Sequence, residues 1–229
     1  MSTKLWSFCA NCVIAVLLLA TSNWLSAASG PKRGPDAPHA DRSEATYRGG
    51  LVTPPLAKPQ LTLTDTSGAP FDFRAETQGY VTLLFFGYTH CPDVCPLHIA
   101  NIATVLRQLP AHVADQIKVV FVTTDPARDT PAVLRTWLDH FDKRFIGLTG
   151  SDAEIEAAQR AAALPAARKA PLAHHDYQVE HASFVIAYTK DDFAHVIYPG
   201  GVSPKDWTED LPRLVKETWS NTKMGSLGP

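Results

Sequence analysis

Two nearly continuous apolar runs, Val81–Gly87 and Ile117–Thr123, predict the centre of the fold. A strand that is covered on both faces has such a run rather than an alternating pattern. Apolar and polar residues alternate over residues 61–64 and again over 71–73, and a turn-like Asp-Thr-Ser-Gly segment at 65–68 separates them. This pattern is typical of a β-hairpin that precedes the first central strand.

Four further stretches have the apolar spacing of amphipathic helices: residues 96–109, 131–141, 152–163 and 203–219. We expect Asp129 or Thr130 to cap the second of these helices, with Pro131 in its first turn. Pro212 should kink or restart the last helix, because proline cannot donate the backbone hydrogen bond of a helix interior.

Between the third and fourth helices, residues 164–178 contain prolines and polar residues and predict a loop. The apolar runs 182–188 and 193–198 then predict two strands joined by a short turn. The resulting order of elements is that of an α/β, thioredoxin-like fold. It has an N-terminal β-hairpin, central parallel strands, an antiparallel hairpin and helices on both faces.

Residues 1–28 indicate a targeting segment. No charged residue occurs over 5–31, and an apolar core at 12–20 is followed by Ser-Ala-Ala at 26–28. This fits a cleaved secretory signal peptide, while an uncleaved membrane anchor stays open. Either way the rest of the chain is exported, and we expect it on the periplasmic side of the inner membrane, anchored or released.

The Pro- and Gly-rich residues 29–59 predict a flexible tether, residues 60–219 the folded domain, and 220–229 a frayed tail. The 229-residue chain has a net charge of −2 and 45% hydrophobic residues, an ordinary globular composition. The near-neutral charge and the lack of a basic patch give no reason to expect a nucleic acid partner.

Cys91 and Cys95 carry the candidate chemistry, because the other two cysteines, Cys9 and Cys12, belong to the targeting segment. The pair follows the first central strand and opens the next helix, in a Cys-Pro-Asp-Val-Cys-Pro sequence. One helical turn apart, both sulfurs can face one point, where they can hold a soft metal or close a redox disulfide. A purely structural disulfide would close a very small loop and stabilise little.

The predicted topology brings His181 to these thiols. The strand 182–188 should run antiparallel to Val81–Gly87, so that its start adjoins the end of the central strand, which leads to Cys91. Two thiolates and one imidazole suit Cu(I). With one added ligand, they also suit Cu(II). Cys95 also lies near a helix start, where the helix dipole favours its thiolate.

Other residues near the motif are weaker candidates. His90 directly precedes the first cysteine, and His98 follows the second by one helical turn. His98 could complete a local zinc site, although a solvent-facing position is favoured. His174 and His175 lie in the predicted loop, either solvated or as auxiliary metal-capturing groups. Asp125 ends the second central strand and can orient the site or act as a weak ligand.

Residues 86–96, Phe-Gly-Tyr-Thr-His-Cys-Pro-Asp-Val-Cys-Pro, closely resemble the Sco/SenC family of copper-binding proteins. So do residues 125–131, Asp-Pro-Ala-Arg-Asp-Thr-Pro, and the Gly-Leu-Thr-Gly of 147–150. Residues 180–183, Glu-His-Ala-Ser, look like the histidine segment of the family. The resemblance extends over about 60–219, nearly the whole predicted exported part.

The resemblance implies that the copper ligands are Cys91, Cys95 and His181. It also implies a role in assembling the binuclear copper centre of cytochrome c oxidase, by delivering copper or by reducing cysteines of the target. The expected partners are the copper-bearing oxidase subunit, an upstream copper donor and a thiol–disulfide reductant. The family usually has Asp before the histidine. Glu180 keeps a carboxylate with a longer reach and, with Asp125, is an expected outer group around the metal.

We therefore expect a copper metallochaperone rather than an enzyme, with no catalytic residue assigned. A thiol–disulfide reductase acting on oxidase cysteines stays open, as does a redox or copper sensor. Two features count against a thioredoxin-type enzyme. The cysteines are separated by three residues rather than two, and no proline lies in 177–183, just before the antiparallel strand.

Overall fold

The computed structural model describes residues 47–173 and 176–219. Several predictions lie outside these residues: the targeting segment 1–28, the greater part of the tether 29–59, the tail 220–229, and the loop histidines His174 and His175. None of the helices in the described part combines the length and apolar character needed to cross a membrane.

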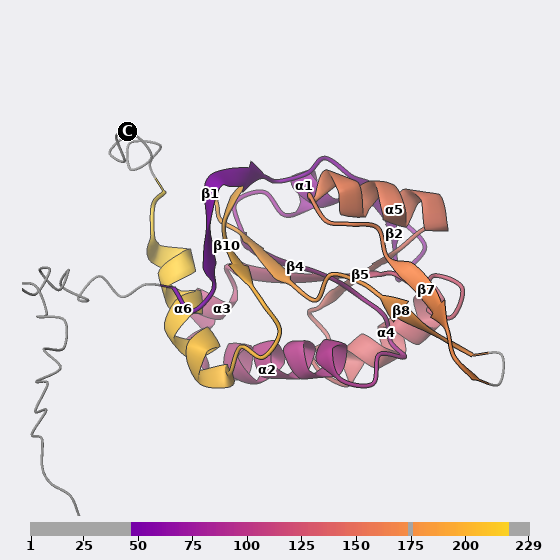
Figure 1. The fold of residues 1–229 in the computed structure, drawn as a ribbon. Helices are drawn as coiled ribbons and strands as arrows, with labels where there is room; N and C mark the ends of the chain where they lie inside the picture. The colour runs from indigo at the N-terminus through magenta and orange to yellow at the C-terminus, as the bar shows by residue number, and fades with distance from the viewer. Residues whose placement is uncertain (1–46, 174–175, 220–229) are drawn as a thin grey trace, which may run out of the picture. The chain divides into compact units, whose positions relative to one another are not determined.

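A mixed, eight-stranded sheet forms the middle layer of the described residues (Figure 1). In spatial order, its strands are β1 (Gly50–Ala57), β10 (Phe193–Tyr198), β9 (Val185–Tyr188), β4 (Val81–Gly87), β5 (Ile117–Thr123), β6 (Ile146–Thr149), β2 (Thr62–Asp65) and β3 (Pro70–Asp72). β4, β5 and β6 are parallel, and β9 runs antiparallel to β4. The predicted thioredoxin-like arrangement of a β-hairpin, central parallel strands and an antiparallel hairpin is thus confirmed.

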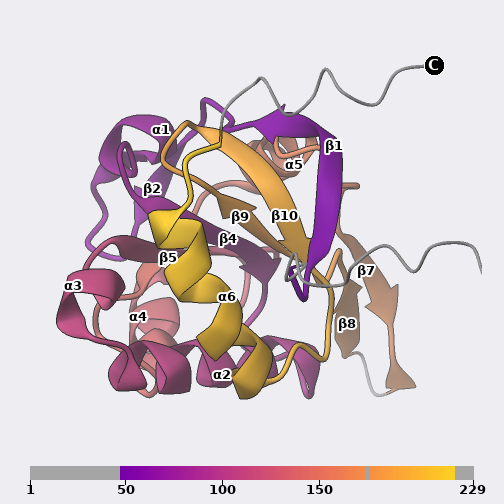
Figure 2. The same cartoon turned by 90° about the vertical axis from the view of Figure 1, so that its left-hand side faces the viewer.

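Helices cover both faces of this sheet (Figure 2). They are α1 (Phe73–Glu76), α2 (Val94–Gln108), α3 (Ala111–Ala114), α4 (Pro131–Asp139), α5 (Asp152–Ala161) and α6 (Pro204–Lys216). Because side chains alternate along a strand, Leu83 and Phe85 of β4 pack with α2, α4 and α6, whereas Leu84 and Phe86 pack with α1 and α5. The predicted double coverage explains why all of β4 is buried and nearly all of it is apolar.

The sequence places the start of the folded domain near residue 60, and the structure corrects this. β1 lies inside the predicted tether and pairs antiparallel with β10, with an irregular register between Leu51 and Leu56. It contains Pro54 and Pro55, which hide the strand pattern. Proline is tolerated here because β1 is the edge of the sheet, where one side of the strand needs no hydrogen-bond donors.

The predicted loop 164–178 is also corrected. It contains β7 (Arg168–Pro171) and leads into β8 (Tyr177–Glu180), and these two strands form a separate two-stranded sheet. β7 has no buried residue and β8 buries only Val179, so the pair has little of the apolar alternation that marks a strand. This hairpin ends one residue before His181 and therefore carries that residue towards the centre of the sheet.

Candidate metal centre

Cys91, Cys95 and His181 come together at one end of the central strands. One ligand atom from each of the three residues lies within 4.8 Å of the other two. Cys91 lies in the loop that follows β4, Cys95 in the first turn of α2, and His181 in the loop between β8 and β9. The juxtaposition expected from the topology is present, although β9 begins three residues later than the predicted strand, at Val185.

The two cysteines are free thiols with different surroundings. Cys95 is fully buried and belongs to the core cluster that α2 forms with β4. Cys91 is partly exposed, and its backbone N–H donates to the carbonyl of Tyr88 at 3.2 Å in a tight turn. The accessible sulfur of the pair is therefore that of Cys91, with Cys95 behind it.

The sequence assigns the stabilised thiolate to Cys95, and the structure assigns it to Cys91. A hydrogen bond from the Cys95 thiol, together with the backbone N–H groups of Asp93 and Cys95, lowers the pKa of Cys91 to about 3. The same bond and burial raise the pKa of Cys95. The reason is geometric: backbone N–H groups at the start of α2 face the Cys91 sulfur in the preceding loop, whereas Cys95 points into the core.

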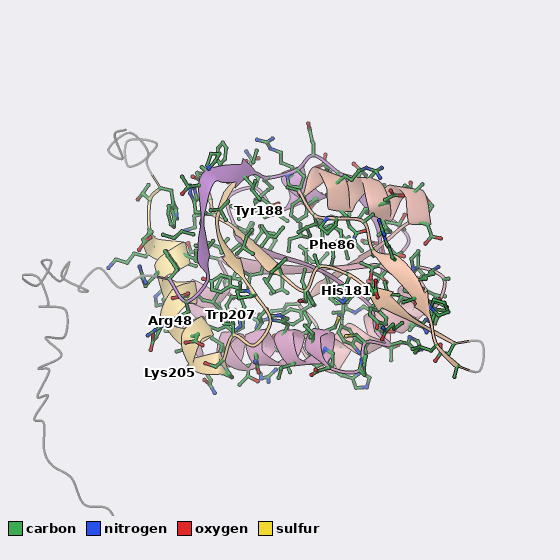
Figure 3. All side chains as sticks on the ribbon, viewed as in Figure 1. Arg48, Phe86, His181, Tyr188, Lys205 and Trp207 are labelled. Carbon is green, nitrogen blue, oxygen red and sulfur yellow. The ribbon has the colours of Figure 1, made fainter. Side chains whose placement is uncertain are left out.

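His181 presents one ring nitrogen to the thiols. Its Nδ1 lies 3.1 Å from the carbonyl oxygen of Ala182, an arrangement that requires the proton on Nδ1. Nε2 then carries the lone pair and lies 3.5 Å from the Cys95 Sγ. The ring packs edge-on against Tyr88 and Phe85, with centroid distances of 5.7 and 6.1 Å. In Figure 3 His181 lies between the end of β4 and the β7–β8 hairpin.

Gly87, the last residue of β4, leaves space for the Cys95 sulfur. A Cβ at this position would lie 2.9 Å from Cys95 Sγ and 3.0 Å from the Phe121 ring. We expect Gly87→Ala to displace the sulfur and to lower the free energy of unfolding by about 1–3 kcal/mol, the usual cost of overpacking a core. Urea unfolding of the reduced protein measures this loss.

Gly50→Ala is the matched control for that substitution, because a Cβ at Gly50 would meet only a carbonyl oxygen at 3.9 Å. It should leave the urea midpoint almost unchanged. Equal stability of the two variants would mean that the sulfur does not depend on the space beside Gly87.

The expected outer groups, Asp125 and Glu180, are placed differently from each other. Asp125 is fully buried and accepts hydrogen bonds from Arg128 and from the Tyr177 hydroxyl. The Arg128 guanidinium stacks on Tyr177 and lies near Tyr88, and Tyr88 contacts the His181 ring. Asp125 is therefore linked to His181 indirectly, through Arg128 and Tyr88. Glu180 is exposed, and its side chain makes no hydrogen bond or ion pair within the described ranges. Its role as an outer group stays a prediction.

His90 and His98 lie outside the Cys-Cys-His group. His90 is exposed, and its Nδ1 lies 3.1 Å from the Thr89 hydroxyl. The solvent-facing position favoured for His98 is wrong: the residue is 2% exposed and its ring packs on Phe85. Burial lowers its pKa. The inward spacing of Cys95, His98 and Ile99 along α2 was the sequence signal for this.

Comparison with known proteins gives a consistent result. A family model described as SCO1/SenC matches residues 53–216. A SCO2-like protein of Rickettsia felis is 43% identical over 94 residues, which are 41% of this chain and 45% of that protein. The mitochondrial SCO2 homologue of Bos taurus is 31% identical over 141 residues, 61% of this chain and 53% of that protein. The chain thus spans about half the length of these curated relatives.

A solved structure of Bradyrhizobium japonicum ScoI, with copper bound, is 34% identical. It superposes with a TM-score of 0.62 and covers 70% of this chain and 99% of the ScoI chain. The family model covers the whole sheet except the start of β1, together with both cysteines and His181. The chain belongs to the SCO1/SenC family.

Proposed function

We propose that this chain is a copper metallochaperone that binds one copper ion through Cys91, Cys95 and His181. In this proposal it delivers the ion for assembly of the binuclear copper centre of cytochrome c oxidase. The observation that carries the proposal is the grouping of two sulfurs and one imidazole nitrogen within 4.8 Å. Copper is then the cargo of the protein, and no catalytic residue is needed.

The chemistry of the donor set supports copper. Thiolate is a soft ligand that selects Cu(I), and imidazole suits copper in either oxidation state. The 3.5 Å between Cys95 Sγ and His181 Nε2 is compatible with one ion bonded at the ~2.0–2.3 Å typical of protein nitrogen and sulfur ligands. The Ala182 carbonyl holds the ring in the tautomer that a metal requires, with Nε2 free. Membership of the SCO1/SenC family, with a copper-bound ScoI among the similar structures, supports the same assignment.

The proposal extends to partners and location. The copper-bearing subunit of the oxidase would receive the ion, an upstream donor would supply it, and a thiol–disulfide reductant would keep the cysteines reduced. We place the protein on the periplasmic side of the inner membrane, anchored or released. The apolar segment at 12–20 supports export. A free thiol pair in an oxidising compartment also explains the need for a reductant.

Titration of the reduced, metal-free protein with copper, followed by absorption and EPR, tests the ligand set. We expect one copper per chain with thiolate-to-Cu(II) charge transfer. His181→Ala should weaken Cu(II) binding by more than the ~10–100-fold caused by losing an outer partner of a ligand, because it removes a ligand itself. The Cys91–Cys95 disulfide should still form in this variant.

His90→Ala is the control for His181→Ala, because His90 adjoins Cys91 in sequence but lies outside the donor group. Its copper spectrum should match that of the wild type. If His181→Ala also kept the wild-type spectrum, the assignment of the third ligand would be wrong.

A thiol–disulfide reductase acting on oxidase cysteines is the second candidate, favoured by one observation. Cys91 is partly exposed with a depressed pKa, and the protonated Cys95 lies directly behind it. The Cys91 thiolate would attack a target disulfide, and Cys95 would then displace the target as a dithiol, leaving a Cys91–Cys95 disulfide for an external dithiol to reduce. Weak copper binding beside a readily cycled disulfide would favour this function over copper delivery.

A further inference from the structure

Asp129 is a buried carboxylate whose bonds lead to the cysteine loop. The residue is fully buried. It accepts hydrogen bonds from the Thr89 N–H at 2.9 Å and the Thr89 hydroxyl at 2.5 Å, and from the Thr123 hydroxyl at 2.6 Å. Within the described ranges, its only approach to a group that can carry positive charge is the 3.7 Å contact with His90 Nδ1.

This carboxylate is not needed to start α4. The cap of α4 is Thr130, whose hydroxyl accepts from the Val133 N–H. Burying a carboxylate is costly unless strong hydrogen bonds compensate it, and two of the three bonds here come from Thr89. The interaction therefore joins the end of β5 to the loop after β4 rather than shaping the helix beside it.

The three candidate ligands are held in place by different means. Cys95 is fixed by core packing, and His181 by its aromatic neighbours and the Ala182 carbonyl. Cys91 packs against the edge of the core, but it is only partly buried and lies outside any helix. It lies two residues after Thr89, in the turn closed by its own N–H on the Tyr88 carbonyl. The buried Tyr88 side chain and the Thr89–Asp129 interaction anchor that turn to the rest of the domain, and the second of these contacts is polar.

We propose that Asp129 is a positioning residue of the metal centre. Through Thr89 it holds the loop that carries Cys91, so that the Cys91 sulfur stays within reach of Cys95 and His181. The expected effect on copper binding rests on the proposed function. The expected effect on formation of the Cys91–Cys95 disulfide does not, because it needs no metal. Fixing one thiol beside another raises its effective concentration and so favours the disulfide over the dithiol.

Asp210 provides a matched comparison at the opposite end of the domain. It is also a buried carboxylate, and it accepts from the Arg48 N–H at 2.7 Å and the Tyr198 hydroxyl at 3.0 Å. Its bonds join the segment before β1 to α6 and β10. In Figure 3 Arg48 lies beside α6, whereas His181 lies at the other end of the sheet. Asp210 thus has the chemistry of Asp129 without access to the cysteines.

The experiment compares Asp129→Asn and Asp210→Asn with the wild-type chain. The metal-free proteins are equilibrated with a thiol–disulfide buffer to obtain the dithiol–disulfide equilibrium constant of Cys91 and Cys95. Their thermal midpoints and copper affinities are measured in parallel. Both variants should melt at lower temperature. Only Asp129→Asn should shift the equilibrium towards the dithiol, by about tenfold or ~30 mV, and weaken copper binding by ~10–100-fold.

Thr89→Val keeps the carboxylate and removes one of its bonds, and it serves where Asp129→Asn fails to fold. It should shift the equilibrium in the same direction by a smaller factor. The proposal is overturned if the Asp129→Asn equilibrium constant equals that of Asp210→Asn, or, where Asp129→Asn does not fold, if Thr89→Val has the wild-type constant. If the wild type itself bound no copper, the proposed function would fail, while the disulfide equilibrium would still decide the role of Asp129.

Discussion

Cys95→Ser is expected to abolish tight copper binding and reversible oxidation together. Serine keeps the size and burial of the side chain but replaces a soft sulfur by a neutral hydroxyl, which is a poor ligand for Cu(I). The same change removes the partner with which Cys91 forms a disulfide. One buried sulfur atom takes part in both chemistries. In this single variant, copper titration should therefore detect no tight binding, and thiol counting after mild oxidation should detect no intramolecular disulfide.

Two comparisons make the Cys95→Ser result decisive. Cys91→Ser should lose copper to a similar extent, since both sulfurs belong to the same donor group. The thermal midpoint of each variant, measured without metal, shows whether the fold survives. A folded Cys95→Ser protein that still bound copper tightly would point to His90 or His98 as the missing ligand, and the free Nε2 of buried His98 makes it the first residue to test.

The centre of this fold could be predicted from sequence because its signals are local. β4 and β5 are continuous apolar runs, and their flanking helices have regular apolar spacing. Once these elements are in order, the antiparallel position of β9 follows from the topology. That step brought His181 to the cysteines across the 86 residues that separate it from Cys95, with no local signal in the histidine itself.

The parts that sequence missed depend on partners far along the chain. β1 contains two prolines and forms a strand because it pairs with β10. The β7–β8 hairpin is mostly exposed, so its pairing leaves little apolar pattern. From sequence, Asp129 was one of two possible caps of the helix that follows it. Its actual hydrogen-bond donors are the hydroxyls of Thr89 and Thr123, which only the folded sheet brings together.

The thiolate assignment failed for a related reason. A helix start favours thiolate, and the sequence offered Cys95 as the residue at that start. Which sulfur accepts hydrogen bonds from the N–H groups of the helix start depends on the direction of each side chain. Core packing sets that direction. The Cys95 side chain enters the core beside Gly87, and the sulfur of Cys91 remains in front of the first turn of α2.

Alkylation of the reduced, metal-free protein should therefore proceed at a rate almost independent of pH between about 5 and 8. Only thiolate reacts, so an ordinary cysteine with a pKa of ~8.5 slows by about 10³-fold over this range. Cys91, with its pKa lowered to about 3, stays ionised throughout it. Stopped-flow measurements with iodoacetamide, and mass spectrometry to locate the label on Cys91, test this. The rate itself should be moderate, because a thiolate of low basicity is a weaker nucleophile.

Cys95→Ala separates the cause of this flat profile from simple exposure of Cys91. The hydrogen bond from the Cys95 thiol is the largest contribution that lowers the pKa of Cys91, so removing this donor should raise the pKa. The sign follows directly: as the pKa rises, the thiolate fraction at acidic pH falls, and the rate regains its dependence on pH. Unfolding in urea should restore the full tenfold loss of alkylation rate per pH unit, because the helix start no longer exists.

A native protein whose alkylation rate already fell tenfold per pH unit below pH 8 would show that Cys91 is an ordinary thiol. The attacking role given to it in the reductase alternative would then fall, while its role as a copper ligand would stand, since a metal can displace the proton of a thiol on binding.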